Sequence, residues 1–230
     1  MSAFAHNFAD PEKVARYATM GPPAFMPGHG GVLQMAGVLL AETMPDDGQM
    51  LVVGAGGGLD TRALAAAGPK WRFVGVDPAP AMLDLARAIV GPEVNARLEL
   101  IEGVAADAPP GPFDAATLIL VLGMIPDDGS KLSILEDIHR RLKPGAPFIL
   151  VDRCGDRTGP AFERDVDRYI AYALASGVDE ATLEGARASQ KANQGLVPPE
   201  RNEALLSEAG FSGVEVFYVG MAWRGWVAYA

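Results

Sequence analysis

Cysteine is almost absent from this chain, which has 230 residues and Cys154 as its single thiol. One cysteine cannot form an internal disulfide, so we expect a reduced, cytoplasmic setting. No histidine is adjacent to it in the sequence, and we interpret Cys154 as a small core residue rather than a nucleophile. The chain also lacks a run of 18 apolar residues, so no membrane-spanning helix is expected. Its first residues lack the basic and apolar regions of a secretory signal, so secretion is not expected.

Positive charge is also in short supply. Lys and Arg total 19 against 29 Asp and Glu, which gives a formal net charge of −10. Proteins that bind nucleic acids usually present a basic face to phosphate groups. The dense basic cluster His139, Arg140, Arg141 and Lys143 lies at the end of a helical pattern, where cations interact favourably with the helix dipole. We therefore expect a small-molecule or protein acceptor rather than a nucleic acid, and we predict no metal site.

Short apolar segments alternate with helical patterns through the first two thirds of the chain. The segments bounded by Gly, Pro or Asp are 50–56, 72–77, 97–103, 115–123 and 147–152. Apolar runs of this length are typical of strands buried on both faces of a parallel sheet. Apolar residues at helical spacing follow Pro80 and recur between Leu132 and Leu142. This alternation predicts βαβ units and a doubly wound α/β domain.

Residues 156–209 interrupt that alternation with three expected helices, the second of them capped by Asp179. The chain then continues into two β-rich runs that meet near Gly220, which predicts an antiparallel strand pair. We divide the single domain into an N-terminal helical cover (1–45), a cofactor-binding core (46–155), a helical insertion (156–200) and a C-terminal helix with the strand pair (201–230). The insertion is interpreted either as an apolar lid over a pocket or as the surface of a homodimer, and the lid would be formed by Phe162, Tyr169, Ile170 and Tyr172.

Three alternate glycines, Gly54, Gly56 and Gly58, lie between the first strand and the next helix in LVVGAGGGLDTRAL. Glycine permits a tight turn and a close approach of ligand to backbone. The N–H groups at a helix start can bind a polar ligand. Asp77 ends the second strand, where its carboxylate can accept both hydroxyls of a ribose. The pattern predicts a ribose-containing ligand at this edge of the sheet.

Glycine loops of this kind occur in two enzyme classes. The dinucleotide-binding pattern would require glycine at position 59, where this chain has Leu59. An NAD(P)-dependent oxidoreductase would also need a catalytic donor set such as Tyr-x-x-x-Lys, which the sequence lacks. That class is therefore the less favoured one, and a loop that merely connects strand to helix is the remaining alternative.

Four segments resemble class I S-adenosylmethionine-dependent methyltransferases in order and in spacing. They are LVVGAGGG, VGVDPAPAMLDLAR, FDAATLILVLGMIPDD and RRLKPGAPFILVD, and the C-terminal strand pair extends the likeness. The resemblance implies a Rossmann-like fold with a mostly parallel seven-stranded sheet, an antiparallel C-terminal strand and an inserted helical lid. It also implies S-adenosyl-L-methionine as the cofactor and methyl transfer to an acceptor, which we expect to be a small molecule.

The resemblance also implies which residues surround the cofactor, all of them at the carboxyl ends of strands. They are Gly54, Ala55, Gly56 and Gly58 after the first strand, Asp77, Pro78 and Met82 after the second, Val104 and Ala105 after the third, and Ile119 and Leu120 at the end of the fourth. The glycine loop would approach the methionyl and ribose groups and Asp77 would hold the ribose hydroxyls. Met82 could pack on the adenine ring, a contact suited to its flexible thioether, although core packing explains it nearly as well.

A closer likeness involves MPGHGGVLQMAGVLLAE, which resembles the branch related to the carboxy-S-adenosylmethionine synthases of tRNA uridine modification. In that branch the residue at the position of His29 touches the cofactor, so we predict His29 as a cofactor contact; a helix-capping role is the alternative. The branch reads its extra carboxylate with an Arg after a Gln-Lys pair. Here Ala192 follows Gln190 and Lys191. Without the guanidinium fork a carboxylate lacks its bidentate partner, which favours ordinary S-adenosylmethionine.

Three departures weaken the family pattern. An acidic residue is replaced by Val52, an Asp by Val104 and a His by Gly123. A non-catalytic or carboxy-S-adenosylmethionine-related cofactor-binding protein is therefore the alternative function. Methyl transfer needs a general base only when the nucleophile must lose a proton. We assign no catalytic residue, although His29, Tyr17 and Tyr169 are considered for that role.

Overall fold

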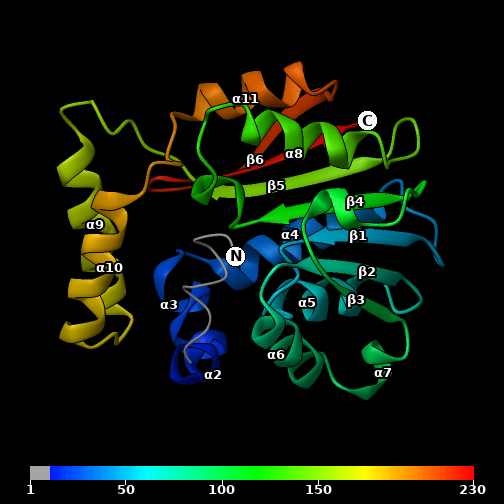
Figure 1. The fold of residues 1–230 in the computed structure, drawn as a ribbon, viewed down its shortest axis with the longest axis horizontal. Helices are drawn as coiled ribbons and strands as arrows, with labels where there is room; N and C mark the ends of the chain where they lie inside the picture. The colour runs from blue at the N-terminus through cyan, green and yellow to red at the C-terminus, as the bar shows by residue number, and fades with distance from the viewer. Residues whose placement is uncertain (1–10) are drawn as a thin grey trace.

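The computed structural model describes residues 11–230, with side chains from Val14 onward, and its centre is one seven-stranded sheet (Figure 1). The strand order is β3-β2-β1-β4-β5-β7-β6, and pairing is parallel from β3 to β5 and antiparallel from β5 to β6. The strands are β1 (Gln49–Val53), β2 (Arg72–Asp77), β3 (Leu98–Glu102), β4 (Ala115–Ile119), β5 (Pro147–Arg153), β6 (Ser212–Gly220) and β7 (Trp223–Tyr229). The predicted fold class is confirmed.

Helices connect the strands and cover the sheet. In the described part of the chain they are α2 (Pro11–Met20), α3 (Pro22–Phe25), α4 (His29–Ala41), α5 (Leu59–Ala67), α6 (Pro80–Val90), α7 (Pro92–Asn95), α8 (Ser130–His139), α9 (Phe162–Ala175), α10 (Glu180–Ala192), α11 (Pro199–Glu208) and the short 3₁₀ turns η1 (Ala105–Asp107) and η2 (Leu122–Met124). None of these helices has the length and apolar composition needed to cross a membrane.

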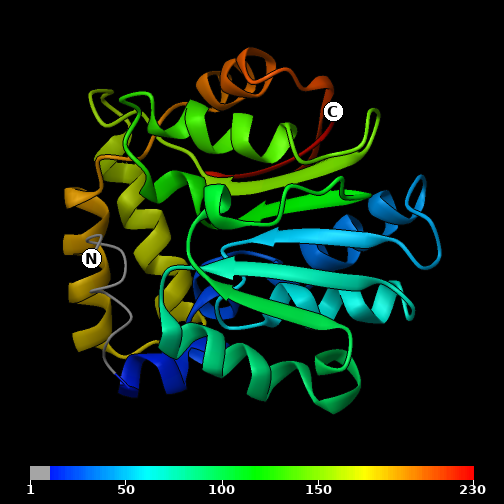
Figure 2. The same cartoon turned by 45° about the vertical axis from the view of Figure 1, so that its right-hand side comes forward.

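The buried core forms a layer on each face of the sheet. Successive residues of a strand point to opposite faces. Leu51 and Val53 of β1 pack in the layer that holds α8 and α11, whereas Met50 and Val52 pack in the layer that holds α4 and α5. Figures 1 and 2 show helices on both sides of the strands. Both faces are covered over the central strands, so β1, β4 and β5 are nearly continuous apolar runs, as predicted. The run at 97–103 differs, because β3 is an edge strand whose residues are only partly buried.

Two expected strands are shorter than their apolar runs. The first ends at Val53 because Gly54 has a φ of 77° and turns the chain. The fourth ends at Ile119 because Leu120 has a φ of 62°, and the chain then enters η2. Both turns lie where the connections from β1 and β4 leave the sheet in opposite directions. Ligands of open α/β sheets bind in the crevice at such a switch point.

The N-terminal helices and the helical insertion lie against each other beyond the carboxyl ends of the strands (Figure 1). Ala24 of α3 shares a small apolar cluster with Ala173 of α9 and Leu183 of α10. Arg16 of α2 forms an exposed ion pair of 3.0 Å with Asp179. Asp179 also accepts a 2.9 Å hydrogen bond from the backbone N–H of Thr182, so the predicted helix cap is confirmed.

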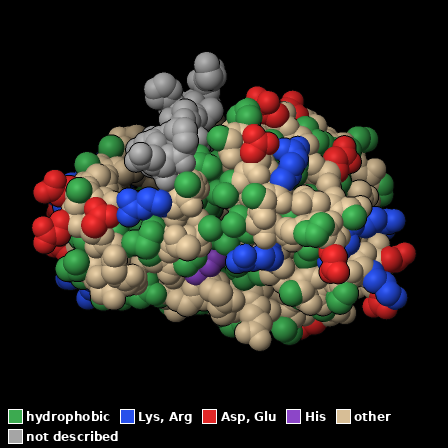
Figure 3. Space-filling view, turned by 90° about the horizontal axis from the view of Figure 1, so that it is seen from below, with side chains coloured by type: hydrophobic (Ala, Val, Ile, Leu, Met, Phe, Trp, Pro, Cys, Tyr) green, Lys and Arg blue, Asp and Glu red, His purple; other side chains and the backbone are tan. Residues whose placement is uncertain are grey.

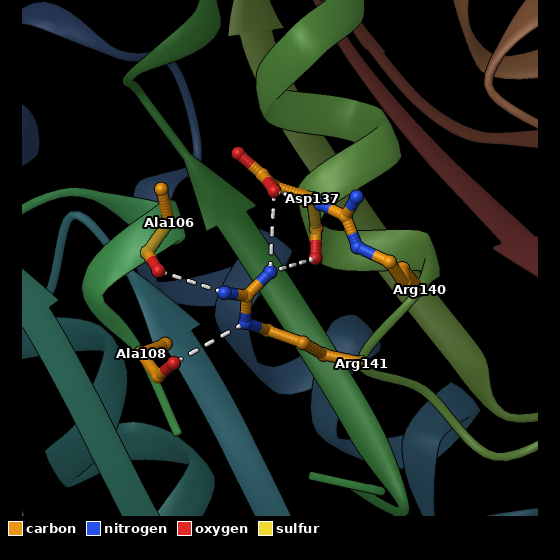
Figure 4. A network of polar contacts seen from close by, with 5 residues as sticks. All are labelled: Ala106, Ala108, Asp137, Arg140 and Arg141. Atoms are coloured by element: carbon orange, nitrogen blue, oxygen red, sulfur yellow. Dashed lines mark hydrogen bonds and ion pairs between the residues drawn. The ribbon is translucent and has the colours of Figure 1, made fainter. Parts of the chain in front are cut away.

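The basic cluster after α8 is engaged in internal contacts (Figure 4). Arg141 donates to the carbonyl oxygens of Ala106 and Asp137 at 2.8 Å each, and Arg140 pairs with the Asp137 carboxylate. Lys143 forms a 2.6 Å ion pair with Asp114. These contacts favour the structural interpretation of the cluster. On the face drawn in Figure 3, acidic and basic side chains are interspersed among apolar ones.

Candidate functional site

The glycine loop is held by its own backbone amides. The N–H groups of Gly54 and Ala55 both donate to the Val76 carbonyl, at 2.9 and 3.0 Å. Gly57 donates to the Met82 carbonyl at 3.1 Å, and Gly58 donates to that of Ala55 at 3.3 Å. The glycine pattern predicts that N–H groups here bind a polar ligand. Instead, the amides of positions 54–58 already have acceptors within the protein, which suits a ligand without phosphate groups at the loop.

Gly56 and Asp77 form the centre of this loop. The Gly56 N–H donates to Asp77 Oδ2 at 2.9 Å, and the Ala79 N–H donates to Asp77 Oδ1 at 2.9 Å. Asp77 is 5% exposed, and burial raises its pKa while the two backbone hydrogen bonds lower it. Each carboxylate oxygen has a second lone pair. Asp77 can therefore hold the loop and still accept hydrogen bonds from a vicinal diol.

A pocket opens beside these two residues, with about 310 Å³ of empty space that includes open solvent, and it is called the cofactor pocket below. Its lining consists of Tyr17, Gly54, Gly56, Asp77, Met82, Ile119, Leu120, Val121 and Met124. Six residues predicted from the sequence thus lie together, contributed by the ends of β1, β2 and β4 and by α6. A Cβ at Gly56 would lie 2.5 Å from Asp77 Oδ2 and 2.8 Å from Met82 Cβ, so only glycine leaves this space open.

The other predicted cofactor residues do not line this pocket. Ala55 and Ala105 are buried, Val104 is exposed, and Pro78 is partly exposed. Gly58 serves helix packing, because a Cβ there would lie 2.8 Å from the Ala86 backbone. Their contact with the cofactor remains a prediction.

His29 lies at the start of α4, outside the lining of the cofactor pocket. The side chain is 7% exposed, and Nε2 has no hydrogen-bond partner among the described residues. Burial lowers the pKa of His29 to about 4, so the imidazole is neutral and a weak base at pH 7. The contact between His29 and the cofactor remains a prediction.

Tyr17 of α2 covers the glycine loop. Its ring stands where a Cβ of Gly57 would be, and it lines the cofactor pocket. Burial, followed by the charges of Asp60 and Asp77, raises the pKa of Tyr17 well above its ordinary value. The hydroxyl therefore stays protonated at neutral pH and is a poor general base.

A second, larger cavity adjoins the first and is called the acceptor cavity below. It holds about 710 Å³ of empty space open to solvent. Its lining is Tyr17, Gly21, Pro22, Phe25, Leu120, Gly123, Met124, Asp152, Arg153, Tyr169, Gln190, Asn193, Leu196 and Trp223. Ligand cavities typically combine apolar and aromatic walls with a few polar groups in this way. Tyr169 of α9 and Gln190 of α10 supply part of the wall. The other residues of the lid interpretation, Phe162, Ile170 and Tyr172, do not line this cavity.

Asp152 and Arg153 at the end of β5 are polar groups of this cavity that the sequence analysis missed. Asp152 Oδ2 accepts a 2.6 Å hydrogen bond from the Gly123 N–H, and a side chain at position 123 would collide with the same carboxylate. Burial raises the pKa of Asp152 to about 6 against the opposing effect of Gly123 and Lys131. Gly123 therefore allows the β5 carboxylate to approach the backbone. The rule that identified Asp77, a polar residue ending a parallel strand, also applies to this pair.

The two cavities share Tyr17, Leu120 and Met124. A positive φ is uncommon for a residue with a side chain, and it marks Leu120 as a position held in place by its surroundings. Its N–H donates to the Val151 carbonyl at 2.8 Å. The backbone turn at Leu120 thus brings the β4 side of the cofactor pocket to the edge of the acceptor cavity.

The cofactor implied by the sequence fits the first pocket. Asp77 is placed to accept a diol, Gly56 leaves room beside it, and the loop amides have no need of a phosphate partner. Metal chemistry lacks a comparable donor set in the described residues, where no three His, Cys, Asp or Glu side chains come together as ligands.

Comparisons with known proteins agree with this geometry. Residues 51–148 match a family model described as a methyltransferase domain. The ubiquinone biosynthesis O-methyltransferase of Xanthomonas campestris pv. campestris is 32% identical over 191 residues, which cover 76% of this chain and 75% of that protein. The carboxy-S-adenosyl-L-methionine synthase of Chromohalobacter salexigens is 26% identical over 97% of this chain and 83% of its own length.

Solved structures show the same fold. An O-methyltransferase family protein from Burkholderia thailandensis aligns over 99% of this chain with a TM-score of 0.70 and 18% identity. The chain spans 61% of the length of that structure. The sequence match to the Xanthomonas enzyme, the shared domain and the common fold lead to one conclusion. The chain belongs to the class I S-adenosylmethionine-dependent methyltransferases.

Proposed function

We propose that this protein transfers a methyl group from S-adenosylmethionine to a small molecule held in the acceptor cavity. The observation that carries the proposal is the meeting of the two cavities at Tyr17, Leu120 and Met124. Methyl transfer requires a donor and an acceptor to be aligned in contact, and such alignment can lower a barrier by on the order of 7–11 kcal/mol. Two adjoining pockets at the switch point of the sheet meet that requirement.

The cofactor's activated methyl group supplies the difficult chemistry when it is bound. In the proposed arrangement Asp77 accepts the ribose hydroxyls and Met82 packs on the adenine. Gly54 and Gly56 provide the space for the ligand, and Leu120 faces the methionyl end. Ile119, which lines the cofactor pocket, is proposed to face the methionyl end together with Leu120. Six further residues belong to the same proposal on the strength of the family resemblance alone: Ala55, Gly58, Pro78, Val104, Ala105 and His29.

The described residues offer two means of excluding water from the junction. Tyr17 lies over the glycine loop, and Tyr169 of α9 and Gln190 of α10 form part of the wall of the acceptor cavity. We propose that the N-terminal cover (1–45, of which 1–10 lie outside the described residues) and the insertion (156–200) close over the core (46–155), with 201–230 completing the sheet. The ion pair between Arg16 and Asp179 supports this grouping.

The acceptor is proposed to be a small molecule methylated on oxygen. The Xanthomonas relative is named as an O-methyltransferase, and the acceptor cavity combines Phe25, Tyr169 and Trp223 with a few polar groups. The net charge of −10 disfavours nucleic acid as a partner. A cytoplasmic location is proposed from the single thiol. A homodimer is proposed from the exposed apolar residues Val216 and Val219 of the edge strand β6 and Met221 of the turn that follows it.

Thermal unfolding in the presence of ligands tests this proposal. S-adenosylhomocysteine should raise the Tm by roughly 5–10 °C at a hundredfold excess over its Kd. NAD at the same concentration should leave the Tm unchanged, and stabilisation by NAD instead would contradict the proposal. Transfer of labelled methyl groups to a panel of hydroxylated small molecules then separates an enzyme from a protein that only binds the cofactor.

A further inference from the structure

Arg153 is a buried cation whose carboxylate-binding edge is unpartnered. The residue is 4% exposed and lines the acceptor cavity. Its Nη1 donates to Gln190 Oε1 at 2.8 Å. Its Nε and Nη2 are buried and have no hydrogen-bond partner among the described residues. The N–H groups of Nε and Nη2 point in the same direction along one edge of the planar guanidinium. This edge can donate two parallel hydrogen bonds to the two oxygens of a carboxylate.

Leaving Nε and Nη2 buried without an acceptor is costly, because these N–H groups have lost water and gained no hydrogen bond in return. The nearby acids do not supply the missing contact. Asp152 accepts backbone hydrogen bonds from Gly123 and from Arg153 itself, and Asp165 pairs with Arg168 at 3.4 Å. The buried Lys131 offsets the Asp152 charge. No described carboxylate therefore pairs with Nε or Nη2 of Arg153.

The wall around Arg153 is aromatic. Its guanidinium carbon lies 5.2 Å from the ring centroid of Tyr169. Tyr169 stacks on Phe25 at 5.2 Å with an interplanar angle of 30°, and its centroid is 6.4 Å from that of Trp223. All three rings line the acceptor cavity. Such a wall suits a flat ring, and the guanidinium at its edge suits an anionic substituent on that ring.

We propose that the acceptor is an aromatic carboxylate whose carboxyl group pairs side-on with Nε and Nη2 of Arg153. This inference rests on the proposed methyltransferase function and names its substrate class. Gln190 acts as a positioning residue, because its hydrogen bond to Nη1 orients the guanidinium and leaves the other edge for the ligand. The aromatic ring of the acceptor would then lie along the wall formed by Phe25, Tyr169 and Trp223.

Calorimetric titration with benzoate and with its neutral analogue benzamide tests the proposal, using the full chain saturated with S-adenosylhomocysteine. Benzoate should bind more tightly than benzamide by on the order of tenfold to a hundredfold, the value of a hydrogen-bonded charge contact. Arg153→Gln should abolish this preference, and Arg153→Lys should retain only part of it because an ammonium lacks the two-nitrogen edge. Arg157→Gln is the matched control, since Arg157 lies outside the cavity lining, and it should bind like the wild type.

A second variant keeps the test independent of folding defects at Arg153. Gln190→Glu would place a carboxylate beside Nη1, where its negative charge offsets the positive charge of the guanidinium. Benzoate binding should then fall about tenfold or more. The proposal is overturned if the wild type does not bind benzoate, if it binds benzamide equally well, or if Arg153→Gln keeps the preference. Failure of the proposed function is measured separately: the wild type would then fail to bind S-adenosylhomocysteine when it is titrated with that ligand before benzoate is added.

Discussion

The Gly56 amide donates to Asp77 Oδ2 over 2.9 Å, and a Cβ at position 56 would lie only 2.5 Å from that oxygen. The glycine and the carboxylate therefore depend on each other. The loop comes close enough to make the hydrogen bond only because it carries no side chain, and the bond holds the carboxylate beside the cofactor pocket. This pair ties the turn after β1 to the end of β2 at the switch point of the sheet.

Gly56→Ala should weaken binding of S-adenosylhomocysteine by about tenfold or more, because the added methyl group forces Asp77 and Met82 apart. Isothermal titration measures the change. Gly185→Ala is the matched control, since a Cβ in that part of α10 meets no atom within 4 Å. It should leave affinity unchanged and raise the stability slightly, as Ala is the better helix former. Equal affinities in the two variants would contradict the role of Gly56.

Tyr169→Ala should reduce benzoate binding several-fold to tenfold while leaving the affinity for S-adenosylhomocysteine unchanged. Tyr169 lines the acceptor cavity but not the cofactor pocket. Its ring contacts both Phe25 and Arg153, so its loss opens the aromatic wall. Tyr172→Ala on the same helix is the control, because Tyr172 lines neither pocket. Sedimentation of the Tyr169 variant should match that of the wild type. A change of oligomeric state with unaltered benzoate binding would favour the dimer interpretation of the insertion.

Asp152 should make the protein less stable as the pH rises from about 4 to about 6. Its pKa is raised to about 6 in the folded chain by burial, and an unfolded Asp titrates near ~3.9. Folding therefore favours the protonated form, and this contribution is full below the unfolded pKa and lost as the pH rises through 6. Urea unfolding from pH 4 to 7 should show the wild type losing stability relative to Asp152→Asn. Parallel curves would argue against the raised pKa.

Asp179 provides a control of opposite sign. Hydrogen bonds from Thr182 and the contact with Arg16 lower its pKa to about 2. Its contribution is present above the unfolded pKa and disappears as the pH falls through 2. Relative to Asp179→Asn, the wild type should therefore gain stability as the pH rises from 2 to 4.

Cys154 should react slowly with a thiol reagent in the native protein. It is 3% exposed, and burial, followed by the charge of Asp152, raises its pKa to about 12, so little thiolate forms at neutral pH. Colour development with Ellman's reagent measures the rate with and without 6 M guanidinium chloride. Rapid labelling of the folded chain would show that the end of β5 opens easily.

The fold and the cofactor pocket were accessible from the sequence because they depend on local patterns. Short apolar runs give buried strands, alternate glycines mark a close turn, and Asp77 ends a strand at the ligand-binding edge. The position of Tyr17 over Gly57 was not predictable, since it follows from packing of α2 rather than from spacing. The state of the loop amides was also missed, because their acceptors at Val76 and Met82 depend on three-dimensional contacts.

The acceptor cavity was the least predictable feature. Arg153 comes from the end of β5, Tyr169 and Gln190 from two helices of the insertion, and Phe25 from the N-terminal cover. No spacing in the chain relates these four positions. The lid interpretation rested on four positions of the helical pattern: Phe162, Tyr169, Ile170 and Tyr172. Of these, Tyr169 lines the cavity and the other three do not, and only the tertiary arrangement brings Tyr169 over a buried guanidinium.

Methyl transfer itself gives the most direct test of the proposed function. The wild-type protein is incubated with S-adenosylmethionine labelled on the methyl group and with a panel of hydroxylated aromatic carboxylates, and the products are separated by chromatography. Label should move to a low-molecular-weight product, and Gly56→Ala should reduce this transfer in parallel with its loss of cofactor affinity. Failure of the wild type to bind S-adenosylhomocysteine, or transfer that is identical in Gly56→Ala, would contradict the assignment of the pocket at Gly56 and Asp77.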